Sequence, residues 1–541
     1  MSNPILDIRD LHIALPPHAD RPFAVQGLDL SIERDEIVCV VGESGSGKSL
    51  TGRAVMRLLP GPHVRATKGV IQFGGEDLLQ VSEARMRSIR GARIAMIFQE
   101  PMTALNPLMT IGEQIDELVR IHRREPASKR RERARDILDD VGLPDPAKML
   151  DAYPHEMSGG QRQRAMIAMA LILEPELIIA DEPTTALDVT TQAQILRLLK
   201  ELQAKHHTGV LYITHDFGVV ADIADRVVVM HNGLQVESGV ADEVLNRPQE
   251  AYTRKLIAAV PSLTPGQRQA YDENDTALET QDLRKTFHTG GGLFGIGGRQ
   301  VDAVRDVSIR LYRGTTLGVV GESGSGKSTL ARLIVRLLEA DSGSIMLDGQ
   351  DQRALGRAEL RKFRKRVQMV FQDPFGSLNP RYRVGRLISE GMIIHGTSTS
   401  EARRRTAELL ELVGLETSAA GRFPHEFSGG QRQRIGLARA LALDPEILVA
   451  DEPVSALDVS VQAQVLKLLD DVRDRFGLSM LFITHDLRVA AQICDHIAVM
   501  SKGEVVEYEP TSRLFADPRH SYTRELLGSV PGRDWVVPDL T

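Results

Sequence analysis

The sequence has few cysteines, few aromatic residues and no excess of positive charge, and each shortage excludes a class of protein. The 541-residue chain contains two cysteines, too few for a framework of disulfides. Aromatic residues make up 4% of it and the formal net charge is −7. This composition disfavours a general nucleic-acid binder, which needs a basic surface and aromatic stacking platforms. With 42% hydrophobic and 26% charged residues, the chain has the composition of an ordinary globular protein.

Long hydrophobic runs are absent as well. The best candidate, Ala165–Leu173, ends before Glu174 and Pro175 after nine residues, whereas a membrane-spanning helix needs about 20. The N-terminal residues MSNPILDIRD contain no basic region followed by an apolar core, so we expect no secretory signal. The sequence therefore predicts a cytosolic chain that does not span a membrane by itself.

What the sequence does contain is one octapeptide twice. GESGSGKS occurs at Gly42–Ser49 and at Gly321–Ser328, each time directly after a short apolar run. In this pattern the glycines let backbone N–H groups curl around phosphate oxygens, the lysine reaches the β and γ phosphates, and the serine hydroxyl binds Mg²⁺. The run at Ile37–Val41 predicts a buried strand before the first loop. The residues after Lys48, with Val55, Met56, Leu58 and Leu59 before Pro60, predict a helix. The predicted nucleotide contacts are Gly42, Ser44, Gly45, Gly47, Lys48, Ser49 and Leu50, and Gly321, Ser323, Gly324, Gly326, Lys327, Ser328 and Thr329.

The rest of the sequence is duplicated too. Each half begins with alternating apolar residues, which predicts an antiparallel sheet. Alternating strands and helices follow, and they predict a mostly parallel α/β core. The polar stretch 262–276 is the predicted linker between domains at 1–261 and 277–532, with a tail at 533–541. The glycine-rich stretch 290–298 is predicted to be a loop. Three motif pairs lie 270 positions apart: Ser158 and Ser428, Asp181 and Asp451, and His215 and His485.

Two carboxylates follow an apolar strand in each half. Asp181 and Glu182 come after LIIA, and Asp451 and Glu452 after ILVA. The first acid can hold Mg²⁺ through water, and the second can polarise a water for attack on the γ-phosphate. A strand that simply ends in solvated acids is the alternative, but each pair follows a P-loop at a suitable distance.

The sequence Ser-Gly-Gly-Gln opens an apolar helix in each half. The serine is a candidate helix cap, and the glycines permit close approach of an anion. Taken alone, these four residues could also be a plain helix start. The candidate ATP-binding residues here are Ser158, Gly159, Gly160 and Gln161, and Ser428, Gly429, Gly430 and Gln431.

The order of these motifs resembles the nucleotide-binding domains of ABC ATPases. In each half a P-loop is followed by a glutamine, SGGQ, the Asp-Glu strand, Ala-Leu-Asp and a histidine, over nearly the whole chain. The resemblance implies two tandem P-loop domains, each with a mostly parallel core sheet, an antiparallel β subdomain and a helical subdomain. It also implies ATP and Mg²⁺ as cofactors, and head-to-tail pairing in which the SGGQ segment of one half closes over ATP on the other P-loop.

The same resemblance assigns roles to individual residues. Expected catalytic residues are Glu182, His215, Glu452 and His485, and expected Mg²⁺ ligands are Ser49, Gln99, Asp181, Ser328, Gln372 and Asp451. Gln99 and Gln372 are also expected ATP contacts. Since neither half lacks the second acid or has an altered SGGQ, we expect both sites to hydrolyse ATP.

An aromatic side chain usually stacks on adenine in this family. Phe287 occupies that place in the second half, whereas Leu15 occupies it in the first. Either Phe23 substitutes for it or the first site binds adenine less firmly. A purely structural role for Phe287 in the core is the alternative.

Further motifs resemble one branch of the family, the bacterial importers of dipeptides, oligopeptides and nickel. They are FQ-[ED]-P-x3-L-N-P at Phe98–Pro107 and Phe371–Pro380, a Pro-His-Glu before each SGGQRQR, and Tyr-Thr-Arg at Tyr252 and Tyr522. The first half resembles the first ATPase subunit of these importers and the second half resembles the second, so the chain resembles a fusion of the two subunits. The resemblance implies an ATP-hydrolysing subunit that powers import of peptides or related small cargo through two separate integral-membrane permease subunits. It further implies a position on the cytoplasmic face of the inner membrane and a periplasmic or lipid-anchored substrate-binding protein.

The alternative function is that of a soluble tandem ABC ATPase acting on ribosomes or DNA. The short linker, the cysteine count and the absence of heptad runs disfavour it. The cargo stays open among dipeptides, oligopeptides, glutathione, peptide antibiotics and nickel, because the cargo does not touch this chain in such a system.

Some importers of this branch carry a cysteine cluster assigned to an iron–sulfur centre. Cys39 and Cys494 form no such cluster in the sequence, so we expect no iron–sulfur centre and predict two small core residues. The basic run Lys129–Arg135 is predicted to be the solvated face of a helix, and His206 and His207 a helix end.

Overall fold

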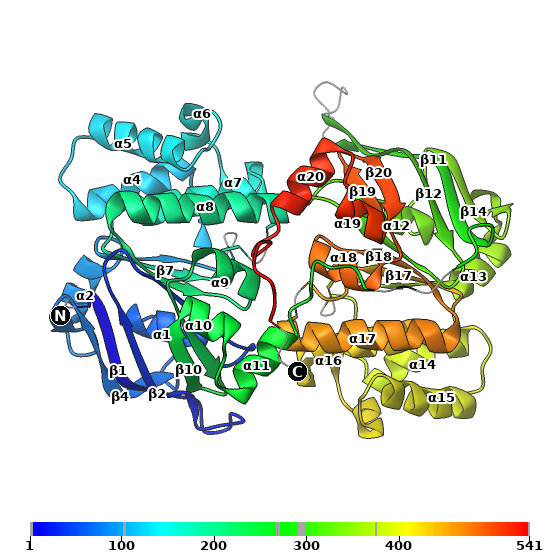
Figure 1. The fold of residues 1–541 in the computed structure, drawn as a ribbon, viewed down its shortest axis with the longest axis horizontal. Helices are drawn as coiled ribbons and strands as arrows, with labels where there is room; N and C mark the ends of the chain where they lie inside the picture. Colours follow the sequence, from blue (N-terminus) through cyan, green and yellow to red (C-terminus); the bar gives the residue numbers. More distant parts are fainter. Residues whose placement is uncertain are drawn as a thin grey trace. The chain divides into compact units, whose positions relative to one another are not determined.

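The chain forms two compact units (Figure 1). The computed structural model describes residues 4–100, 104–184, 187–266, 268, 271–289, 299–373, 376–455 and 457–538. The first unit consists of Met1–Val260 together with Pro531–Thr541, and the second of Pro261–Val530. The glycine-rich stretch 290–298, predicted to be a loop, lies outside the described residues. In the described part of the chain, no helix has both the length and the apolar character needed to cross a membrane.

A six-stranded sheet forms the centre of the first unit. Its order is β10-β9-β3-β8-β7-β6, and only the β9–β10 pair is antiparallel. All five residues of β3 are buried, as expected for a central strand of a sheet covered on both faces. The predicted mostly parallel core is confirmed. The strands are β3 (Ile37–Val41), β6 (Ile94–Ile97), β7 (Leu177–Asp181), β8 (Gly209–Ile213), β9 (Arg226–His231) and β10 (Leu234–Val240).

A second, antiparallel sheet is formed by two strands before the P-loop strand and two strands after it. It contains four strands in the order β2-β1-β4-β5. In β1 the buried residues alternate with more exposed ones, because one face packs on the core and the other does not. The alternation shifts by one residue at Asp10, whose φ is 46°. This irregularity is a β-bulge. The strands are β1 (Leu6–Ala14), β2 (Phe23–Ile32), β4 (Arg65–Phe73) and β5 (Glu76–Asp77).

Helices cover the central sheet and form a separate group beyond it. Figure 1 shows α4, α5 and α6 at one end of the unit and the four-stranded sheet at the other. Thr110 and Glu113 form a capping box that starts α4. The helices are α1 (Lys48–Val55), α2 (Glu83–Ile89), α4 (Ile111–His122), α5 (Ala127–Asp140), α6 (Pro146–Leu150), α7 (Gly159–Leu171), α8 (Val189–His206), α9 (Phe217–Ile223), α10 (Ala241–Asn246) and α11 (Ala251–Ala258).

The second unit repeats this architecture. Its central sheet has the order β16-β17-β18-β13-β19-β20, and its antiparallel sheet β12-β11-β14-β15. The strands are β11 (Thr276–Thr289), β12 (Arg299–Tyr312), β13 (Thr316–Val320), β14 (Ser342–Leu347), β15 (Gln350–Asp351), β16 (Val367–Val370), β17 (Ile447–Asp451), β18 (Ser479–Ile483), β19 (His496–Ser501) and β20 (Glu504–Pro510). The helices are α12 (Lys327–Ile334), α13 (Arg357–Arg366), α14 (Val384–Ile394), α15 (Thr399–Leu412), α16 (Gly429–Leu441), α17 (Val459–Phe476), α18 (Leu487–Ile493), α19 (Thr511–Ala516) and α20 (Ser521–Gly528).

The helix ends show where local sequence was informative. His206 is the last residue of α8, and His207 follows in the left-handed conformation with φ 53°, so the predicted helix end is confirmed. Helix α1 is shorter than predicted. It ends at Val55 because Arg57 adopts φ 51°, which stops the helix before the apolar residues Leu58 and Leu59.

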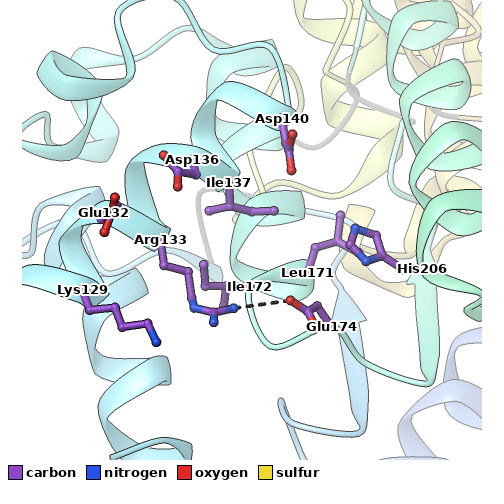
Figure 2. Close-up of a pocket in the computed structure, with 10 residues that line it drawn as sticks. All are labelled: Lys129, Glu132, Arg133, Asp136, Ile137, Asp140, Leu171, Ile172, Glu174 and His206. Carbon is purple, nitrogen blue, oxygen red and sulfur yellow. Dashed lines mark hydrogen bonds and ion pairs between the residues drawn. The ribbon is translucent and has the colours of Figure 1, made fainter. Parts of the chain in front are cut away.

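The basic run on α5 is largely a solvated face, as predicted, and its arginines form ion pairs. Arg130 lies 2.6 Å from Asp116, and Arg131 lies 3.1 Å from Asp151. Arg133 reaches across a hollow of about 260 Å³ to Glu174 at 3.4 Å (Figure 2). Lys129 and His206 line the same hollow. Charges on this face are therefore neutralised within the unit.

Both cysteines are buried core residues, as predicted. Cys39 lies in the central strand β3, and Cys494 follows α18. Burial raises the pKa of both thiols well above the usual value, so neither is a reactive thiolate at neutral pH.

Candidate active site

The first P-loop connects β3 to α1 and depends on two glycines. Gly42 has φ 145°, and a Cβ built there would lie 2.1 Å from the carbonyl oxygen of Met230. Gly47 has φ 103°, and its Cβ would lie 2.4 Å from the carbonyl oxygen of Ala24. A side chain at either position would force the loop away from the strands that support it.

The P-loop lysines are held inside their loops. The Nζ atom of Lys48 donates to the carbonyl oxygens of Gly42 at 2.7 Å and Glu43 at 2.9 Å. The Nζ atom of Lys327 makes the equivalent bonds at 2.7 and 2.7 Å. Both lysines are 5% exposed. A buried ammonium group held by carbonyl oxygens is a strong binding site for an anion.

A serine hydroxyl meets a buried carboxylate beside each loop. Ser49 Oγ donates to Asp181 Oδ1 at 2.7 Å, and Ser328 Oγ donates to Asp451 Oδ1 at 3.0 Å. The pKa of both aspartates is raised, because the effect of burial outweighs that of the hydrogen bond from the serine. Hydroxyl and carboxylate oxygens are hard ligands that suit Mg²⁺, and a cation there would stabilise the buried carboxylate.

A glutamine, a glutamate and a histidine come together at the carboxyl end of the central sheet. In the first unit Gln99 Nε2 donates to Glu182 Oε2 at 2.9 Å, and His215 Nδ1 lies 3.4 Å from Glu182 Oε1. In the second unit the distances are 2.9 Å from Gln372 to Glu452 and 3.2 Å from His485 to Glu452.

The glutamates hold an unusual backbone conformation. Glu182 has φ 47° and Glu452 has φ 45°, a region that costs a residue with a side chain about 1–2 kcal/mol. The strain is offset because each glutamate N–H donates to a strand carbonyl, of Ile213 and Ile483 respectively, at 2.9 Å. Both units therefore hold this glutamate in the same backbone conformation at the carboxyl end of the central sheet.

The glutamate and histidine of the second unit tune one another. Burial by itself would raise the pKa of Glu452, but the hydrogen bond and charge of His485 and the charge of Lys327 outweigh it, so the pKa of Glu452 is lowered. Burial would lower the pKa of His485, but the hydrogen bond and charge of Glu452 raise it above the usual value. The pair therefore favours a carboxylate facing an imidazolium.

The two SGGQ segments start α7 and α16 as capping boxes. Ser158 Oγ accepts from Gln161 N at 3.3 Å, and Gln161 Oε1 accepts from Ser158 N at 2.9 Å. A Cβ at Gly160 would lie 2.8 Å from Thr191 Cγ2, so this glycine is needed for packing against α8. A Cβ at Gly159 would meet nothing within 4 Å. The second unit repeats the capping box at Ser428 and Gln431. There a Cβ at Gly430 would crowd Val461, and one at Gly429 would lie 4.0 Å from Leu457 Cδ2.

A hollow of about 540 Å³ lies at the second P-loop. Its lining brings together predicted residues with others that the motifs did not indicate. The predicted ones are Ser323, Gly324, Gly326, Lys327, Ser328, Thr329, Gln372 and Glu452, and the others Gln300, Val301, Asp302, Ala303, Arg305 and Lys502. Among these described lining residues, none belongs to the SGGQ segment of the same unit.

Phe287 borders the same site. It pairs with Val301 in the β11–β12 ladder, its ring is partly exposed, and Lys285 Nζ lies 5.7 Å from the ring centre. In the first unit Leu15 packs against the core. The ring of Phe23 makes an edge contact with His12 at 5.6 Å.

Sequence reasoning missed three residues at the loops. Arg21 donates to the carbonyl oxygen of Gly45 in the first P-loop. The hydroxyl of Tyr252 accepts from Glu43 N at 3.4 Å, and that of Tyr522 accepts from Glu322 N at 3.1 Å. The repeated Tyr-Thr-Arg motif was a signal for the tyrosines, although nothing in it indicates contact with a loop about 200 residues earlier.

The chain matches two family models, each twice. The model described as ABC transporter matches residues 25–185 and 304–455. The model described as Oligopeptide/dipeptide transporter, C-terminal region, matches residues 236–290 and 506–535.

Curated relatives match over nearly the whole length. The chain is similar to the glutathione import ATP-binding protein GsiA of Salmonella choleraesuis (strain SC-B67), with 46% identity over 98% of this chain and 90% of the relative. It is 45% identical to the protein of the same name from Escherichia coli (strain K12), over 97% of this chain and 89% of the relative. Among solved structures, a dimeric post-hydrolysis state of an ATP-binding cassette bound to ADP and Pi is 30% identical, with a TM-score of 0.39 over 43% of this chain.

Proposed function

Because the chain belongs to the ABC transporter family, we propose that it powers the import of short peptides or related small cargo. It is a fused pair of ATP-binding domains of the oligopeptide and dipeptide importer branch. Subunits of this kind bind and hydrolyse ATP and act with membrane permeases. The match at 236–290 and 506–535 favours transport over the alternative of action on ribosomes or DNA.

One observation supports the proposal most directly. In both units the P-loop lysine, the serine–aspartate pair and the glutamine–glutamate–histidine group have matching contacts, with distances that differ by 0.3 Å or less. A decayed half would have lost some of these contacts. We therefore propose that both sites hydrolyse ATP.

The proposed mechanism uses the residues in fixed roles. The loop N–H groups and Lys48 bind the β and γ phosphates, and Ser49 and Asp181 hold Mg²⁺, which when bound neutralises phosphate charge. Glu182, hydrogen-bonded to Gln99, accepts a proton from the attacking water. His215 orients Glu182. In the second unit the corresponding residues are Lys327, Ser328, Asp451, Glu452, Gln372 and His485.

We further propose that ATP drives head-to-tail closure of the two halves. Ser158 and Gly159 are exposed within their unit, and the space around Gly159 is open. An exposed helix N-terminus with free N–H groups is suited to bind a phosphate from another domain. Phe287 is proposed to stack on adenine in the second site.

The helical subdomains are the proposed contact with two permease subunits. Leu108 is 86% exposed and Ile121 on α4 is 65% exposed, and Ile394 at the end of α14 is 57% exposed. Exposed apolar side chains of this size are typical of an interaction surface. A substrate-binding protein that delivers the cargo, and a position on the cytoplasmic face of the membrane, complete the proposal. Glutathione, which the relatives' names specify, is the first cargo to test.

Reconstitution in vesicles tests this function. The chain is co-expressed with two permease subunits, and ATP-dependent uptake of labelled di- and tripeptides is measured with the binding protein added. Wild type is expected to transport, and the double variant Glu182→Gln, Glu452→Gln is expected to lose about 10²–10⁴ of the ATPase rate together with uptake. The single variants should each keep part of the activity, and Glu201→Gln, an exposed carboxylate on α8, is the matched control.

Two outcomes would contradict the proposal. Full ATPase in Glu182→Gln with none in Glu452→Gln would disprove equal sites. Co-sedimentation of the chain with ribosomes, without any association with permeases, would disprove the transport function.

A further inference from the structure

The chain crosses between the two units twice, at equivalent points. Unit one ends at Val260, two residues after α11, and the residues that follow pack in unit two. Unit two ends at Val530, two residues after α20, and the residues that follow pack in unit one. We call residues 261–266 the first strap and residues 531–535 the second strap.

The second strap is docked on α9 and α10 of unit one. Gly532 N donates to Asp222 Oδ2 at 2.9 Å, and Trp535 Nε1 donates to Asn246 Oδ1 at 3.0 Å. Pro531 and Gly532 are buried. A Cβ at Gly218 would lie 2.5 Å from the carbonyl oxygen of Pro531, so this helix glycine provides the space in which the strap lies.

The first strap is docked on α18 of unit two, at positions equivalent to those that the second strap contacts in unit one. Arg488 Nη1 donates to the carbonyl oxygen of Pro261 at 3.1 Å, and Gln492 Nε2 donates to that of Ser262 at 2.8 Å. The contacting residues occupy equivalent positions in the two units, because 218 and 488, 222 and 492, 261 and 531, and 262 and 532 are each 270 positions apart. The docking is therefore part of the duplicated design of the chain.

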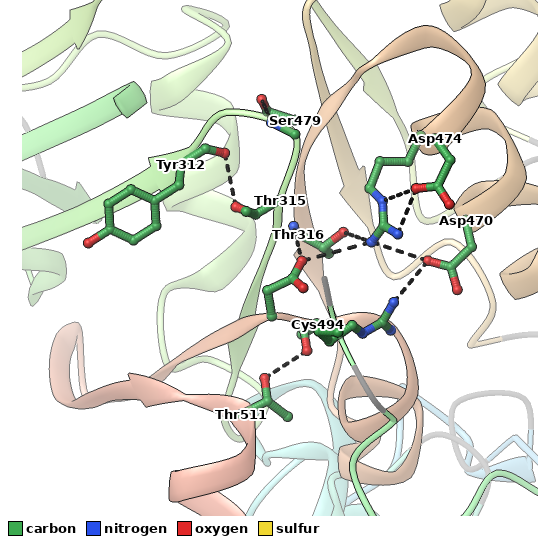
Figure 3. Close-up of polar contacts among 12 residues, drawn as sticks. Tyr312, Thr315, Thr316, Asp470, Asp474, Ser479, Cys494 and Thr511 are labelled. Carbon is green, nitrogen blue, oxygen red and sulfur yellow. Dashed lines mark hydrogen bonds and ion pairs between the residues drawn. The ribbon is translucent and has the colours of Figure 1, made fainter. Parts of the chain in front are cut away.

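Arg268 extends the first dock beyond the strap. It donates to the carbonyl oxygen of Gln492 and, at 3.3 Å, to Asp470 on α17. Figure 3 shows Asp470 and Asp474 beside the strand that begins at Thr316. Arg473 lies 3.3 Å from Asp470 as well, so the dock is joined to an ion-pair network that is half-buried in unit two.

Each strap touches the helix that follows a proposed catalytic histidine. Asp216, next to His215, caps α9 by accepting from Gly218 N at 2.8 Å. Asp486, next to His485, caps α18 by accepting from Arg488 N at 2.8 Å. Gly218 and Arg488 thus each contact both a strap and the capping aspartate next to a histidine. A shift of the strap would therefore act on that aspartate.

The other end of each strap leads back to a P-loop. Tyr522, in the first turn of α20, accepts from Glu322 N of the second P-loop, and the second strap begins three residues after α20 ends. Tyr252 on α11 does the same for the first P-loop and the first strap. These helices have eight residues each and are therefore about 12 Å long, and each joins a P-loop contact in its first turn to the start of a strap.

We propose that the straps form a crossed relay, in which the P-loop of each unit positions the histidine helix of the other unit. ATP bound at the second P-loop sets the position of Tyr522, α20 and the second strap, and the strap sets the start of α9 and so His215. The first P-loop acts on His485 through Tyr252, α11 and the first strap. Coupling of this kind needs a chain of contiguous contacts with two arrangements. The inference rests on the roles proposed above for the P-loops and the histidines.

Trp535 provides a direct reporter, because it is the only tryptophan of the chain and lies in the second strap. In the full-length double variant Glu182→Gln, Glu452→Gln, saturating ATP should change the quenching of tryptophan emission by acrylamide. Tyr522→Phe, which removes only the hydroxyl, should abolish at least half of that change. Tyr252→Phe is the matched control in the other unit and should keep it. An equal response in the two phenylalanine variants, or no response to ATP although ATP binds, would overturn the relay.

Gly218→Ala tests the dock by steady-state kinetics. Alanine suits a helix better than glycine. Its Cβ would lie 2.5 Å from the Pro531 carbonyl oxygen and 3.1 Å from Asp216 Oδ1, so the main expected penalty is loss of space for the strap. The turnover number kcat for ATP should fall by about fivefold, a typical coupling between sites, with KM unchanged and Trp535 more accessible to acrylamide. Removal of residues 531–541 should lower kcat similarly, and the combined variant should show no further loss. Additive losses, or an unchanged kcat with an undocked strap, would contradict the proposal.

These results separate the relay from the proposed function. If the chain binds no ATP, or if His215→Ala leaves hydrolysis unchanged, the proposed site is wrong. If ATP binds and His215→Ala is impaired while Gly218→Ala behaves as wild type, only the relay is wrong.

Discussion

At the scale of single residues, the pairing of Glu452 with His485 determines which protonation state the site prefers. The pKa of Glu452 is lowered and that of His485 is raised. The raised pKa of His485 contributes to the stability of the fold. This contribution is complete below the unfolded histidine pKa of about 6.5, and it is lost as pH rises through the raised pKa of the folded state. The glutamate contribution is present above its unfolded pKa of about 4.3 and is lost as pH falls through the lowered value. The full contribution of the pair is therefore present between about pH 4.3 and 6.5.

Removing the carboxylate should reverse the shift at His485. In Glu452→Gln the hydrogen bond to a charged partner is gone and burial of the ring remains, so we expect the pKa of His485 to fall below its wild-type value. Titration of the histidine ring signals by NMR, with His485→Gln used to assign the resonance, measures it. Glu504→Gln, an exposed carboxylate on β20, is the control. An unchanged or higher pKa in Glu452→Gln would mean that Glu452 is not the group that holds the proton on His485.

At the scale of secondary-structure elements, the SGGQ segments combine a structural glycine with one that the fold does not need. Gly160 lies against Thr191 of α8, and Gly430 lies against Val461 of α17. Gly159 faces open space in its own unit. Two neighbouring glycines of one motif are thus present for different physical reasons.

This difference gives opposite expectations for two alanine variants. Gly160→Ala forces α7 away from α8 and should lower the free energy of unfolding by about 1–3 kcal/mol, as overpacking does. Gly159→Ala should leave the melting temperature unchanged but lower the ATPase rate if this glycine approaches ATP on the other P-loop. Calorimetry and phosphate release measure the two effects. Wild-type hydrolysis in Gly159→Ala would remove this glycine from the proposed site.

At the scale of the whole molecule, transport requires that hydrolysis be coupled to other subunits. The exposed apolar residues of the helical subdomain have no packing role within their unit that would explain them. Leu108 is 86% exposed, and it follows the FQ-[ED]-P-x3-L-N-P motif that the chain shares in both halves.

A charge at this position should separate hydrolysis from transport. Leu108→Asp is expected to fold and to keep basal ATPase, because an exposed side chain contributes little to stability. It should lose cargo-stimulated ATPase and uptake, since a carboxylate would be buried in the permease contact. Leu234→Asp, at a 47% exposed leucine on β10, is the matched control and should transport normally. Normal uptake in Leu108→Asp would exclude this residue from the coupling surface.

Much of the fold and site could be predicted because the signals are local. The P-loops, the Asp-Glu strands and the SGGQ helix starts are runs of a few residues whose conformation follows from glycine, capping side chains and apolar periodicity. Element ends depend on backbone conformations that these runs do not record. Helix α1 stopped before Leu58 because Arg57 takes a left-handed conformation, which no side-chain pattern around it indicates.

The sequence by itself determined that this protein has two ATP-binding halves of one family, since the chemistry of phosphate binding requires particular residue types at fixed short spacings. Only the tertiary structure decided which distant residues support that chemistry. Tyr252 and Tyr522 reach P-loops about 200 residues away, and the straps after α11 and α20 pack in the unit opposite to the one they leave. Such contacts depend on how the chain returns on itself in three dimensions, and neither periodicity nor spacing records that path.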